Sequence, residues 1–430
     1  MTDADRLIDL TVFDAAGLTT PPPTPPTPEP TAVHPLLSLA LVGTVVFLAV
    51  STKQLLVLAV VGALAGMIFL HELGHFLTAR LTNTKATEFF VGFGPRLWSF
   101  RRGETEFGIK AIPLGGYVKI LGMTNLDNGI DPSDETRTYR QASYPKRVLM
   151  AGAGTAMHLI LAFVLFMVMF AGTGRLEQPS ESAAAVIDIS PGSPAEAAGL
   201  QSGDRVVSMN GKAIATFGQL RSVVQASADL PIAVKVERAE RIVSTTVTPL
   251  SSGEQLIIGV SLKPVVIRES IPSAIGKSAT SIGKLLPETF VSLQRFFSPS
   301  NLISYSKNVY SPPTTEEGKQ SAENNRMLSP VGAANLLSDA AKFDFRLFLL
   351  IFASINVFVG MFNMLPILPL DGGHILIATY ERIRSRPKRG IRYRADFASW
   401  LPVTYAVMAV MLLLSISSLY LDIRSPINIF

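Results

Sequence analysis

The sequence contains no cysteine. This absence excludes disulfide bridges, thiolate nucleophiles and thiolate metal sites, so any bound metal must be held by histidine and carboxylate side chains. Charged residues are also scarce, at 17%, whereas 48% of the residues are hydrophobic and the mean hydropathy is +0.35. Such a chain is too apolar for an ordinary soluble protein, and we expect membrane spans combined with a soluble part. Only five histidines are present: His34, His71, His75, His158 and His374.

The N-terminal segment, residues 1–34, is acidic at first and then rich in proline and threonine. Such a run cannot form a core and favours extended conformations, which predicts a disordered tail or, as an alternative, a docking segment for a proline-binding module. Residues 35–51 are uncharged and apolar but short for a span. We expect them to form either an extra N-terminal span or a re-entrant segment. A cleaved signal peptide is not expected, because no basic leader precedes the run.

Four longer apolar runs indicate core membrane spans. Basic residues concentrate in the loop after the first run and in the loop after the third, and the positive-inside rule places both loops on the cytoplasmic side. The part of the chain between the second and third spans is then extracytoplasmic. The predicted spans cover residues 54–80, 147–174, 346–378 and 397–421, and the two basic loops cover residues 81–146 and 379–396.

The segments outside the spans differ in character. Residues 81–146 contain two alternating stretches around a turn at residues 101–103, which predicts a β-hairpin. Residues 175–265 have short apolar runs separated by Gly, Asp and Asn turns, so we expect a small, mostly β domain there. Residues 266–345 contain amphipathic helical stretches and are interpreted as a helical linker.

The sequence His71-Glu72-Leu73-Gly74-His75 ends the apolar part of the first core span. On a helix the two histidines are one turn apart on one face, so both imidazoles can reach one metal ion, and Glu72 lies beside that face where it can take a proton from a water molecule. The alternative is a buried, hydrogen-bonded cluster of histidine and glutamate. Ionisable groups within apolar spans are costly and usually functional, which favours the metal site.

Asp371 is the second carboxylate in an apolar setting. Both it and Glu72 fall near the inner ends of spans that run in the same direction, so they are expected at the same membrane depth. Pro366 and Pro369 must break the helix before Asp371, and irregular backbone at that depth requires a protein-enclosed polar cavity. Two histidines and one aspartate form an adequate ligand set for a catalytic zinc ion. The alternative for Asp371 alone is a helix cap at the membrane edge.

These motifs resemble the site-2 protease family of intramembrane zinc metalloproteases, in particular the bacterial branch that includes the regulator of sigma-E protease. The resemblance rests on His71–His75, on Asn363-Met-Leu-Pro-Ile-Leu-Pro-Leu-Asp371-Gly, and on two glycine-containing stretches, residues 90–95 and 112–118. Residues 191–211 resemble a bacterial PDZ domain. The likeness extends over roughly residues 54–425.

The resemblance implies an α-helical multi-pass membrane protein with four core spans, a membrane-associated β-hairpin and an inserted, mostly β PDZ domain over residues 175–265. The extra N-terminal span expected at residues 35–51 and the proline-rich tail lie outside the usual core of this family. It also implies the roles of individual residues. His71, His75 and Asp371 would bind one zinc ion, Glu72 would activate water, and Asn363 would contact the substrate backbone. The hairpin would offer an edge strand to an unwound substrate. The substrate-binding residues expected in these stretches are Asn363, Gly92, Gly94, Gly115 and Gly116.

The sequence departs from this family in the second core span. The family's Gly-Pro-x-x-Asn pattern appears here as Gly154-Thr-Ala-Met-His158, so that both proline and asparagine are replaced. We expect His158 to make a polar contact near the site, and it is not assigned as a metal ligand.

The expected activity is intramembrane zinc-dependent endoproteolysis in a bacterial cell membrane. The resemblance implies substrates that are single-span membrane proteins of the anti-sigma factor type or remnant signal peptides, with a peptide C-terminus as the ligand of the PDZ domain. No nucleic-acid partner is expected. Three alternatives remain from the residues: a non-catalytic scaffold that binds partners through its PDZ domain, a transporter with an intramembrane ion site, and a membrane-anchored protease with its zinc outside the bilayer.

Overall fold

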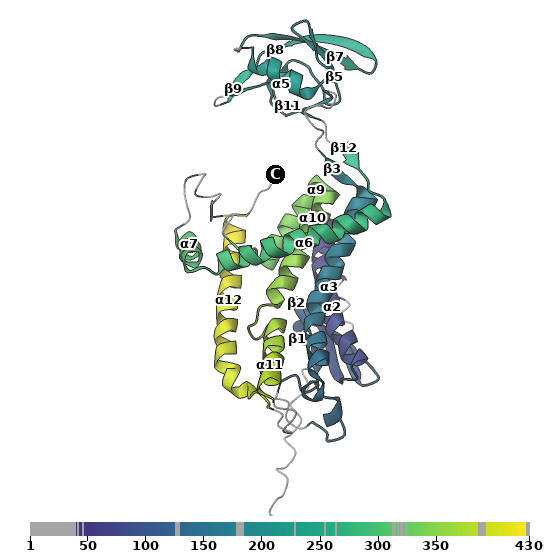
Figure 1. Ribbon diagram of the computed structural model, residues 1–430, viewed down its shortest axis with the longest axis vertical. Coiled ribbons are helices and arrows are strands. Elements are labelled where there is room, and N and C mark those ends of the chain that lie inside the picture. The colour runs from purple at the N-terminus through teal and green to yellow at the C-terminus, as the bar shows by residue number, and fades with distance from the viewer. Residues whose placement is uncertain are drawn as a thin grey trace, which may run out of the picture. The chain divides into compact units, whose positions relative to one another are not determined.

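Within the residues that it describes, the computed structural model contains four helices that are long and apolar enough to cross a membrane, as expected for a multi-pass membrane protein (Figure 1). They are Leu55–Leu81, Tyr144–Thr173, Phe345–Asn363 and Ala398–Arg424. The structure describes residues 47–124, 130–177, 185–227, 229–252, 255–262, 265–311, 326–385 and 393–426, and a few isolated positions between residues 40 and 322. The predicted tail, residues 1–34, lies outside the described residues, as does most of the predicted extra span, residues 35–51, of which residues 47–51 are helical.

The chain divides into two compact units, which are described separately. The first unit contains the first described span, the hairpin that follows it, most of the second span and the C-terminal helices. The second unit contains the strand-rich middle of the chain. The first comprises Met1–Leu161, Thr289–Asp339 and Asn356–Phe430, and the second comprises Ala162–Glu288 and Ala340–Ile355.

Helix α2 (Leu55–Leu81) begins the described part of the first unit. Its sequence contains no proline and only apolar or small residues before its histidines, so nothing interrupts the backbone hydrogen bonds. The helix ends where Asn83 adopts a φ of +59°. The N–H of Asn83 then bonds the Arg80 carbonyl at 3.1 Å, and the N–H of Thr84 bonds the Ala79 carbonyl at 2.8 Å. This Schellman motif satisfies the last carbonyls and ends α2 soon after its polar segment.

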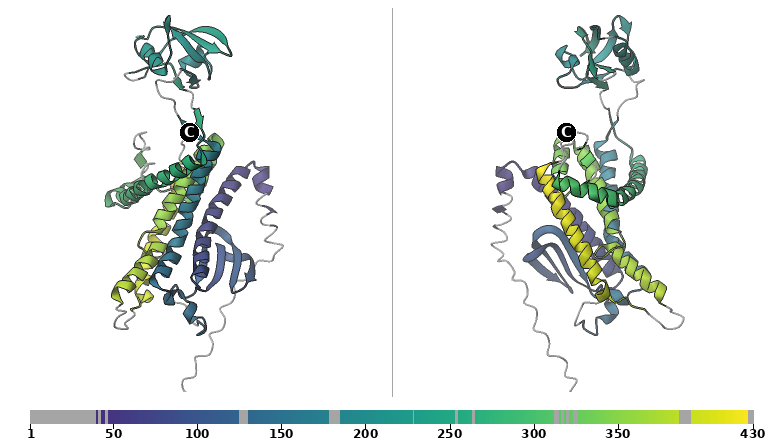
Figure 2. Two further views of the ribbon diagram at one scale, coloured as in Figure 1. Left: turned by 45° about the vertical axis from the view of Figure 1, so that its right-hand side comes forward. Right: turned by 90° about the vertical axis from the view of Figure 1, so that its left-hand side faces the viewer.

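Strands β1 (Ala86–Arg102) and β2 (Thr105–Ile120) form an antiparallel hairpin that packs against α2 (Figure 2). The turn contains Gly103, at the position that the sequence indicates. One face of the hairpin is aromatic. The Phe89 ring lies edge-on to the Phe76 ring of α2, with the centroids 5.7 Å apart, and this contact fixes the hairpin beside the polar end of the helix.

Both strands of the hairpin bend near their middle. Residues 88–91 of β1 therefore pair with residues 106–109 of β2 on one side and with residues 116–119 on the other. Gly92 adopts a φ of +91° at the bend of β1, which side chains other than glycine's rarely allow. Because of these bends, residues 116–119 form an edge of the sheet next to α2.

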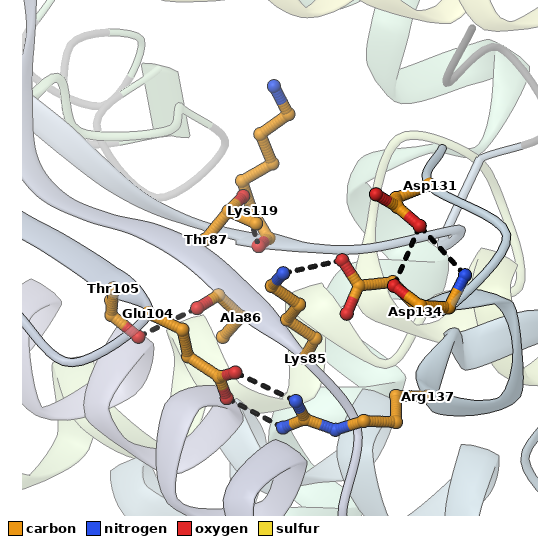
Figure 3. A network of polar contacts seen from close by, with 10 residues as sticks. Lys85, Ala86, Thr87, Glu104, Thr105, Lys119, Asp131, Asp134 and Arg137 are labelled. Atoms are coloured by element: carbon orange, nitrogen blue, oxygen red, sulfur yellow. Dashed lines mark hydrogen bonds and ion pairs between the residues drawn. The ribbon is translucent and has the colours of Figure 1, made fainter. Parts of the chain in front are cut away.

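Two ion pairs connect the base of the hairpin to the loop that follows it (Figure 3). Lys85 donates to Asp134 at 2.5 Å, and Arg137 donates two hydrogen bonds to Glu104, at 2.8 and 2.6 Å. The Arg137 guanidinium keeps the pKa of the Glu104 carboxyl below its usual value. Since these side chains are partly exposed, each pair contributes at most about 1 kcal/mol to stability. Their main effect is to fix the position of the loop before the next helix.

Helix α3 (Tyr144–Met167) packs closely against α2 through small residues. A Cβ atom added to Gly74 of α2 would lie 2.7 Å from the carbonyl oxygen of Ala153 on α3. The two backbones can approach this closely only because both positions are small, which is a common form of helix packing in membranes.

Helix α10 (Phe345–Asn363) stops before two prolines, and helix α11 (Asp371–Arg384) begins after them. Proline lacks a backbone donor and disfavours helical geometry in the residue before it, so the break follows from Pro366 and Pro369. The broken segment folds against the start of α11, where a Cβ on Gly372 would lie 2.2 Å from the Met364 carbonyl oxygen. The predicted span over residues 346–378 is thus two helices, and the second continues beyond its predicted end.

The second unit contains a four-stranded antiparallel sheet in the order β6-β5-β7-β8. Helix α5 (Phe217–Gln225) begins with a capping box, in which Thr216 and Gln219 satisfy each other's backbone donors. The buried core of this unit includes Val206, Val234 and Val236 from the sheet and Leu220 from α5. The strands are β3 (Arg175–Glu177), β4 (Ile187–Ile189), β5 (Arg205–Met209), β6 (Lys212–Ala213), β7 (Ile232–Arg238), β8 (Arg241–Val247), β9 (Leu250–Ser252), β10 (Gln255–Ile257), β11 (Val260–Leu262) and β12 (Val265–Ile267), and α4 is Pro194–Ala197.

The remaining helices are α6 (Ile271–Phe296), α7 (Pro299–Tyr310), α9 (Pro330–Phe343) and α12 (Leu401–Arg424). Polar contacts hold the C-terminal part of α12 in the first unit. The Tyr305 hydroxyl lies 2.8 Å from the Ser417 hydroxyl, and the backbone N–H of Ser329 donates to Asp422 at 2.7 Å.

Candidate metal centre and active-site cavity

Three predicted ligands meet at the junction of α2 and α11. The Nε2 atoms of His71 and His75 both lie 3.4 Å from Oδ2 of Asp371, and they lie 3.2 Å from each other. The histidines are one helical turn apart on α2, and Asp371 is the first residue of α11. Among the described residues, these three form the one group of ligand side chains whose donor atoms all lie within 4.8 Å of one another.

The hydrogen bonds around this group leave its electron pairs directed inward. Nδ1 of His75 lies 2.8 Å from the Met150 carbonyl oxygen. A carbonyl oxygen can only accept, so Nδ1 carries the proton and Nε2 presents a lone pair. Oδ2 of Asp371 is buried and has no hydrogen-bond donor among the described residues. Nε2 of His71 faces these two atoms, so that two imidazole nitrogens and one carboxylate oxygen can share one cation, and this donor set fits zinc.

Glu72 lies beside the three ligands and lines a cavity of about 770 Å³. Helix α2 supplies one wall of the cavity, the hairpin a second, and helices α3, α10 and α12 the others. Its lining includes Ile68, His71, Glu72, Phe93, Gly115, Gly116, His158, Val359, Asn363, Leu370, Met408, Met411, Leu412 and Ser415. A carboxylate next to a metal centre and open to a cavity is the arrangement that general-base chemistry on a bound molecule requires.

The four predicted glycines of the hairpin occupy two different places. Gly115 and Gly116 line the cavity, and a Cβ on Gly116 would lie 3.0 Å from Cγ of Glu72. Gly92 and Gly94 are not among the lining residues. A Cβ on Gly92 would lie 2.8 Å from the Lys110 carbonyl oxygen, so this glycine permits the bend of the strand.

The predicted substrate contact Asn363 is the last residue of α10 and lines the same cavity. His158 lines it from α3. The His158 ring centroid lies 5.0 Å from that of His71, and its Nδ1 lies 3.1 Å from Oδ1 of Asn356 on α10. The structure therefore brings His71, Glu72, Asn363 and His158 around one cavity, and the other two predicted ligands, His75 and Asp371, lie next to His71.

Glycine at position 154 makes room for the first ligand. A Cβ on Gly154 of α3 would lie 2.2 Å from Cε1 of His71 and 2.6 Å from its Nε2. Only glycine allows α3 to pass this close to the imidazole ring without displacing it.

A buried ion pair connects α3 to α11 below the metal centre. Nη1 of Arg147 lies 2.5 Å from Oε2 of Glu381, and the two side chains are 9% and 7% exposed. The other carboxylate oxygen of Glu381 accepts the N–H of Ala395 at 2.7 Å. Arg147 precedes Met150, which holds His75, and Glu381 lies on the helix that begins with Asp371, so this pair joins the two elements that support the ligands.

The sequence did not identify Asn356, the Met150 carbonyl or the Arg147–Glu381 pair as parts of the site. Asn356 carries a usable signal, because it is an amide within an otherwise apolar span and such residues are usually bonded and functional. The other two have no local sequence signal, since their partners are on distant helices.

Comparison with known proteins gives the family. The sequence profile of peptidase family M50 matches residues 59–403. The zinc metalloprotease Rip1 of Mycobacterium tuberculosis strain H37Rv is 31% identical over 84% of this chain and 96% of the relative. The zinc metalloprotease Rip1 of Mycolicibacterium smegmatis is also 31% identical, over the same shares of the two chains. The matched region includes every residue of the candidate metal centre.

Proposed function

Because the chain belongs to peptidase family M50, whose zinc metalloproteases it resembles over most of its length, we propose that it cleaves membrane-embedded polypeptides with the residues around this cavity. In this proposal His71, His75 and Asp371 hold one zinc ion and Glu72 is the general base. The observation that carries it is the convergence of three ligand atoms, Nε2 of His71, Nε2 of His75 and Oδ2 of Asp371, beside the Glu72 carboxylate and a cavity.

When bound, a zinc ion would supply a Lewis acid that polarises the scissile carbonyl and acidifies water. The chain's own residues do the rest. Glu72 accepts a proton from the attacking water and returns it to the leaving amine. The Met150 carbonyl holds the His75 ring in the tautomer that leaves Nε2 available.

We further propose that the edge of the hairpin holds the substrate in an extended form. A peptide bond within a helix is shielded by its own hydrogen bonds, so a membrane-spanning substrate must unwind before water can reach it. Among the described strands, residues 116–119 pair with β1 on one side only, and Gly116 of this edge lies next to Glu72. Adding a strand there would satisfy the substrate's backbone groups. Asn363, which also lines the cavity, would bond the substrate backbone near the cleaved peptide, and Gly92 and Gly94 would act indirectly by bending β1.

The substrates that fit are single-span membrane proteins of the anti-sigma factor type and remnant signal peptides. In this proposal residues 175–265 form a PDZ domain that lies outside the cytoplasm and binds a peptide C-terminus. Two observations support the PDZ domain: residues 191–211 resemble a bacterial PDZ domain in sequence, and this part of the chain contains a small antiparallel sheet together with α5. The zinc site would lie near the cytoplasmic side, because the basic loops around residues 81–146 and 379–396 favour that side.

We propose the following order along the chain. A disordered tail (1–34) and an extra span (35–51) precede the core. The core then consists of a span with the histidines (54–80), a hairpin region (81–146), a second span (147–174), the PDZ domain (175–265), a helical linker (266–345), a span that carries Asp371 (346–378), a basic loop (379–396) and a last span (397–421).

The test is cleavage of a single-span reporter whose outer part has already been trimmed, by the full-length protein, with zinc content measured on the same preparations. Glu72→Gln should lower cleavage by about 10²–10⁴-fold and keep the zinc, because only the base is lost. Asp371→Ala should lose both cleavage and zinc, since a ligand is removed. Glu288→Gln, which changes an exposed carboxylate on α6, is the matched control and should behave as wild type.

Two outcomes contradict the proposal in different ways. Cleavage that persists in Glu72→Gln means that another group activates water. A wild-type protein that neither holds zinc nor cleaves the trimmed reporter supports the alternative of a non-catalytic scaffold on the same fold.

A further inference from the structure

His158 is a buried polar residue of the cavity that the proposed chemistry does not use. Only 3% of its surface is exposed, and it lines the cavity together with Glu72 and Asn363. Its ring lies 5.0 Å from the ring of His71. A substrate that reaches the metal centre must therefore pass within contact distance of His158.

The orientation of the His158 ring is set from the neighbouring helix. Asn356 of α10 is fully buried, and its Oδ1 lies 3.1 Å from Nδ1 of His158. An amide oxygen can only accept a hydrogen bond, so Nδ1 carries the proton of the neutral imidazole. The second ring nitrogen, Nε2, then has a lone pair and can only accept.

Nε2 of His158 has no hydrogen-bond partner within the described part of the chain. An acceptor without a donor in an apolar environment is costly, and at membrane depth few donors are available. The cavity that His158 lines is the direction from which a donor can come. A molecule in this cavity that carries a hydrogen-bond donor beside His158 would satisfy this nitrogen.

We propose that His158 binds the substrate backbone, with Nε2 accepting a hydrogen bond from one peptide N–H of the extended segment, and that Asn356 is the positioning residue that fixes the ring. An unwound peptide offers N–H groups that have lost their helical partners, and an acceptor can satisfy an N–H but not a carbonyl. This inference rests on the proposed protease function.

The hydrogen bonds that His158 can make also differ from those of an asparagine at this position. An asparagine side chain can donate and accept at once, whereas His158 with its Nδ1 bonded to Asn356 has only one acceptor to offer. The pairing of His158 with Asn356 therefore makes the contact selective for a donor on the substrate.

The experiment uses full-length protein in lipid nanodiscs and a synthetic single-span peptide that the wild type cleaves. In a set of analogues, one backbone amide at a time on either side of the cleaved bond is replaced by an ester, which removes that N–H. His158→Leu should lower kcat/KM about tenfold for the all-amide peptide and leave the zinc content unchanged. One ester analogue should be cleaved equally by wild type and His158→Leu, because the N–H that His158 binds is already missing.

Two further variants separate substrate contact from helix packing. His158→Gln restores an acceptor and should recover part of the lost rate. Thr155→Val is the matched control, because Thr155 lies one turn earlier on α3 and donates to the Gly360 carbonyl of α10 at 3.0 Å without lining the cavity. It should cleave every peptide of the set as wild type does.

Asn356 is tested by a double-mutant cycle. Asn356→Leu should lower kcat/KM about as much as His158→Leu, and the double variant should lose no more than either single variant. Additive losses would overturn the positioning role of Asn356.

Three results would overturn the role of His158. In the first, every ester analogue shows the same His158→Leu effect as the all-amide peptide. In the second, His158→Leu loses zinc, which would make His158 a metal ligand. In the third, wild type cleaves no single-span peptide although it holds zinc, and then the proposed function fails together with this inference.

Discussion

Gly154 is the residue whose replacement should damage the metal centre most directly without removing a ligand. The Cβ of Gly154→Ala would lie 2.2 Å from Cε1 of His71, so either the ring or α3 must move. We expect zinc affinity to fall about 10- to 100-fold, the range typical for changes to residues that orient ligands, and cleavage to fall with it. Competition with a chromophoric chelator measures the affinity.

Gly152→Ala is the matched control for that change. The nearest atom to its Cβ is Cδ1 of Ile375, at 3.9 Å, which is an ordinary contact. Zinc affinity should stay at the wild-type value in this variant. Equal zinc affinity in Gly154→Ala and Gly152→Ala would show that α3 does not constrain the His71 ring.

At the scale of single residues, the sequence predicts the three residues that meet in the candidate metal centre, but not the contacts that hold them in place. His71 and His75 have the spacing of one helical turn, and Asp371 follows a proline-broken apolar run, so each has a local pattern. The pairing of His158 with Asn356 could not be predicted, because the two residues are on different helices, although an amide within an apolar span marks Asn356 as a residue to examine. Spacing encodes contacts within one helix, whereas contacts between helices depend on how the helices pack.

The hairpin edge gives a prediction at the scale of elements. A Cβ in Gly116→Ala would lie 3.0 Å from Cγ of Glu72 and 3.1 Å from the Phe90 carbonyl oxygen, so the edge strand or Glu72 must shift. Cleavage should fall about tenfold or more while zinc is retained, because the ligands are not touched. Gly62→Ala on α2, where nothing lies within 4 Å, is the control and should keep full activity. Loss of zinc in Gly116→Ala would contradict this expectation.

The ion pair between α3 and α11 gives a second prediction at this scale. Arg147→Leu leaves the Glu381 carboxylate buried without its partner, and removing one member of such a pair typically costs about 3–5 kcal/mol. The thermal unfolding midpoint of the full-length protein in detergent should fall clearly. Replacing both residues by leucine should be less damaging than the single change, since no buried charge is left behind.

The surface pair Arg205–Glu237 is the control for this comparison. Its side chains are 56% and 34% exposed, so Arg205→Leu should cost no more than about 1 kcal/mol. If Arg147→Leu and Arg205→Leu lower stability equally, the α3–α11 pair does not hold the ligand-bearing elements together.

At the scale of elements, the sequence predicts which segments are helices and strands better than where they bend. The prolines before Asp371 predict the break between α10 and α11 because proline cannot continue a helix. The continuation of α11 to Arg384 was not predicted. It brings Glu381 against Arg147 on another helix, and a contact between helices leaves no pattern in the local sequence. The pairing of residues 88–91 with both halves of β2 was also not predicted, because alternation gives strands but not their curvature.

At the scale of the whole molecule, composition and hydropathy are sufficient to predict four core spans separated by a strand-rich segment. Burial in a membrane requires long apolar helices, and this requirement is visible in any single sequence. The division into two compact units has a consequence that hydropathy does not give. All three ligands belong to the first unit, while the sheet β6-β5-β7-β8 belongs to the second.

Removal of zinc should therefore affect the two units differently. A ligand that binds only the folded state stabilises it by about 2.7 kcal/mol at a concentration of 100 times its Kd, and here the ion joins α2 to α11. Chelation of the full-length protein should increase amide hydrogen exchange around His75 and Asp371 and leave β5 and β7 unchanged. Asp371→Ala should already exchange rapidly at α11 and should not respond to the chelator. An equal increase in β5 and β7 would mean that the metal centre controls the folding of the second unit as well, and that the two units share one cooperative transition.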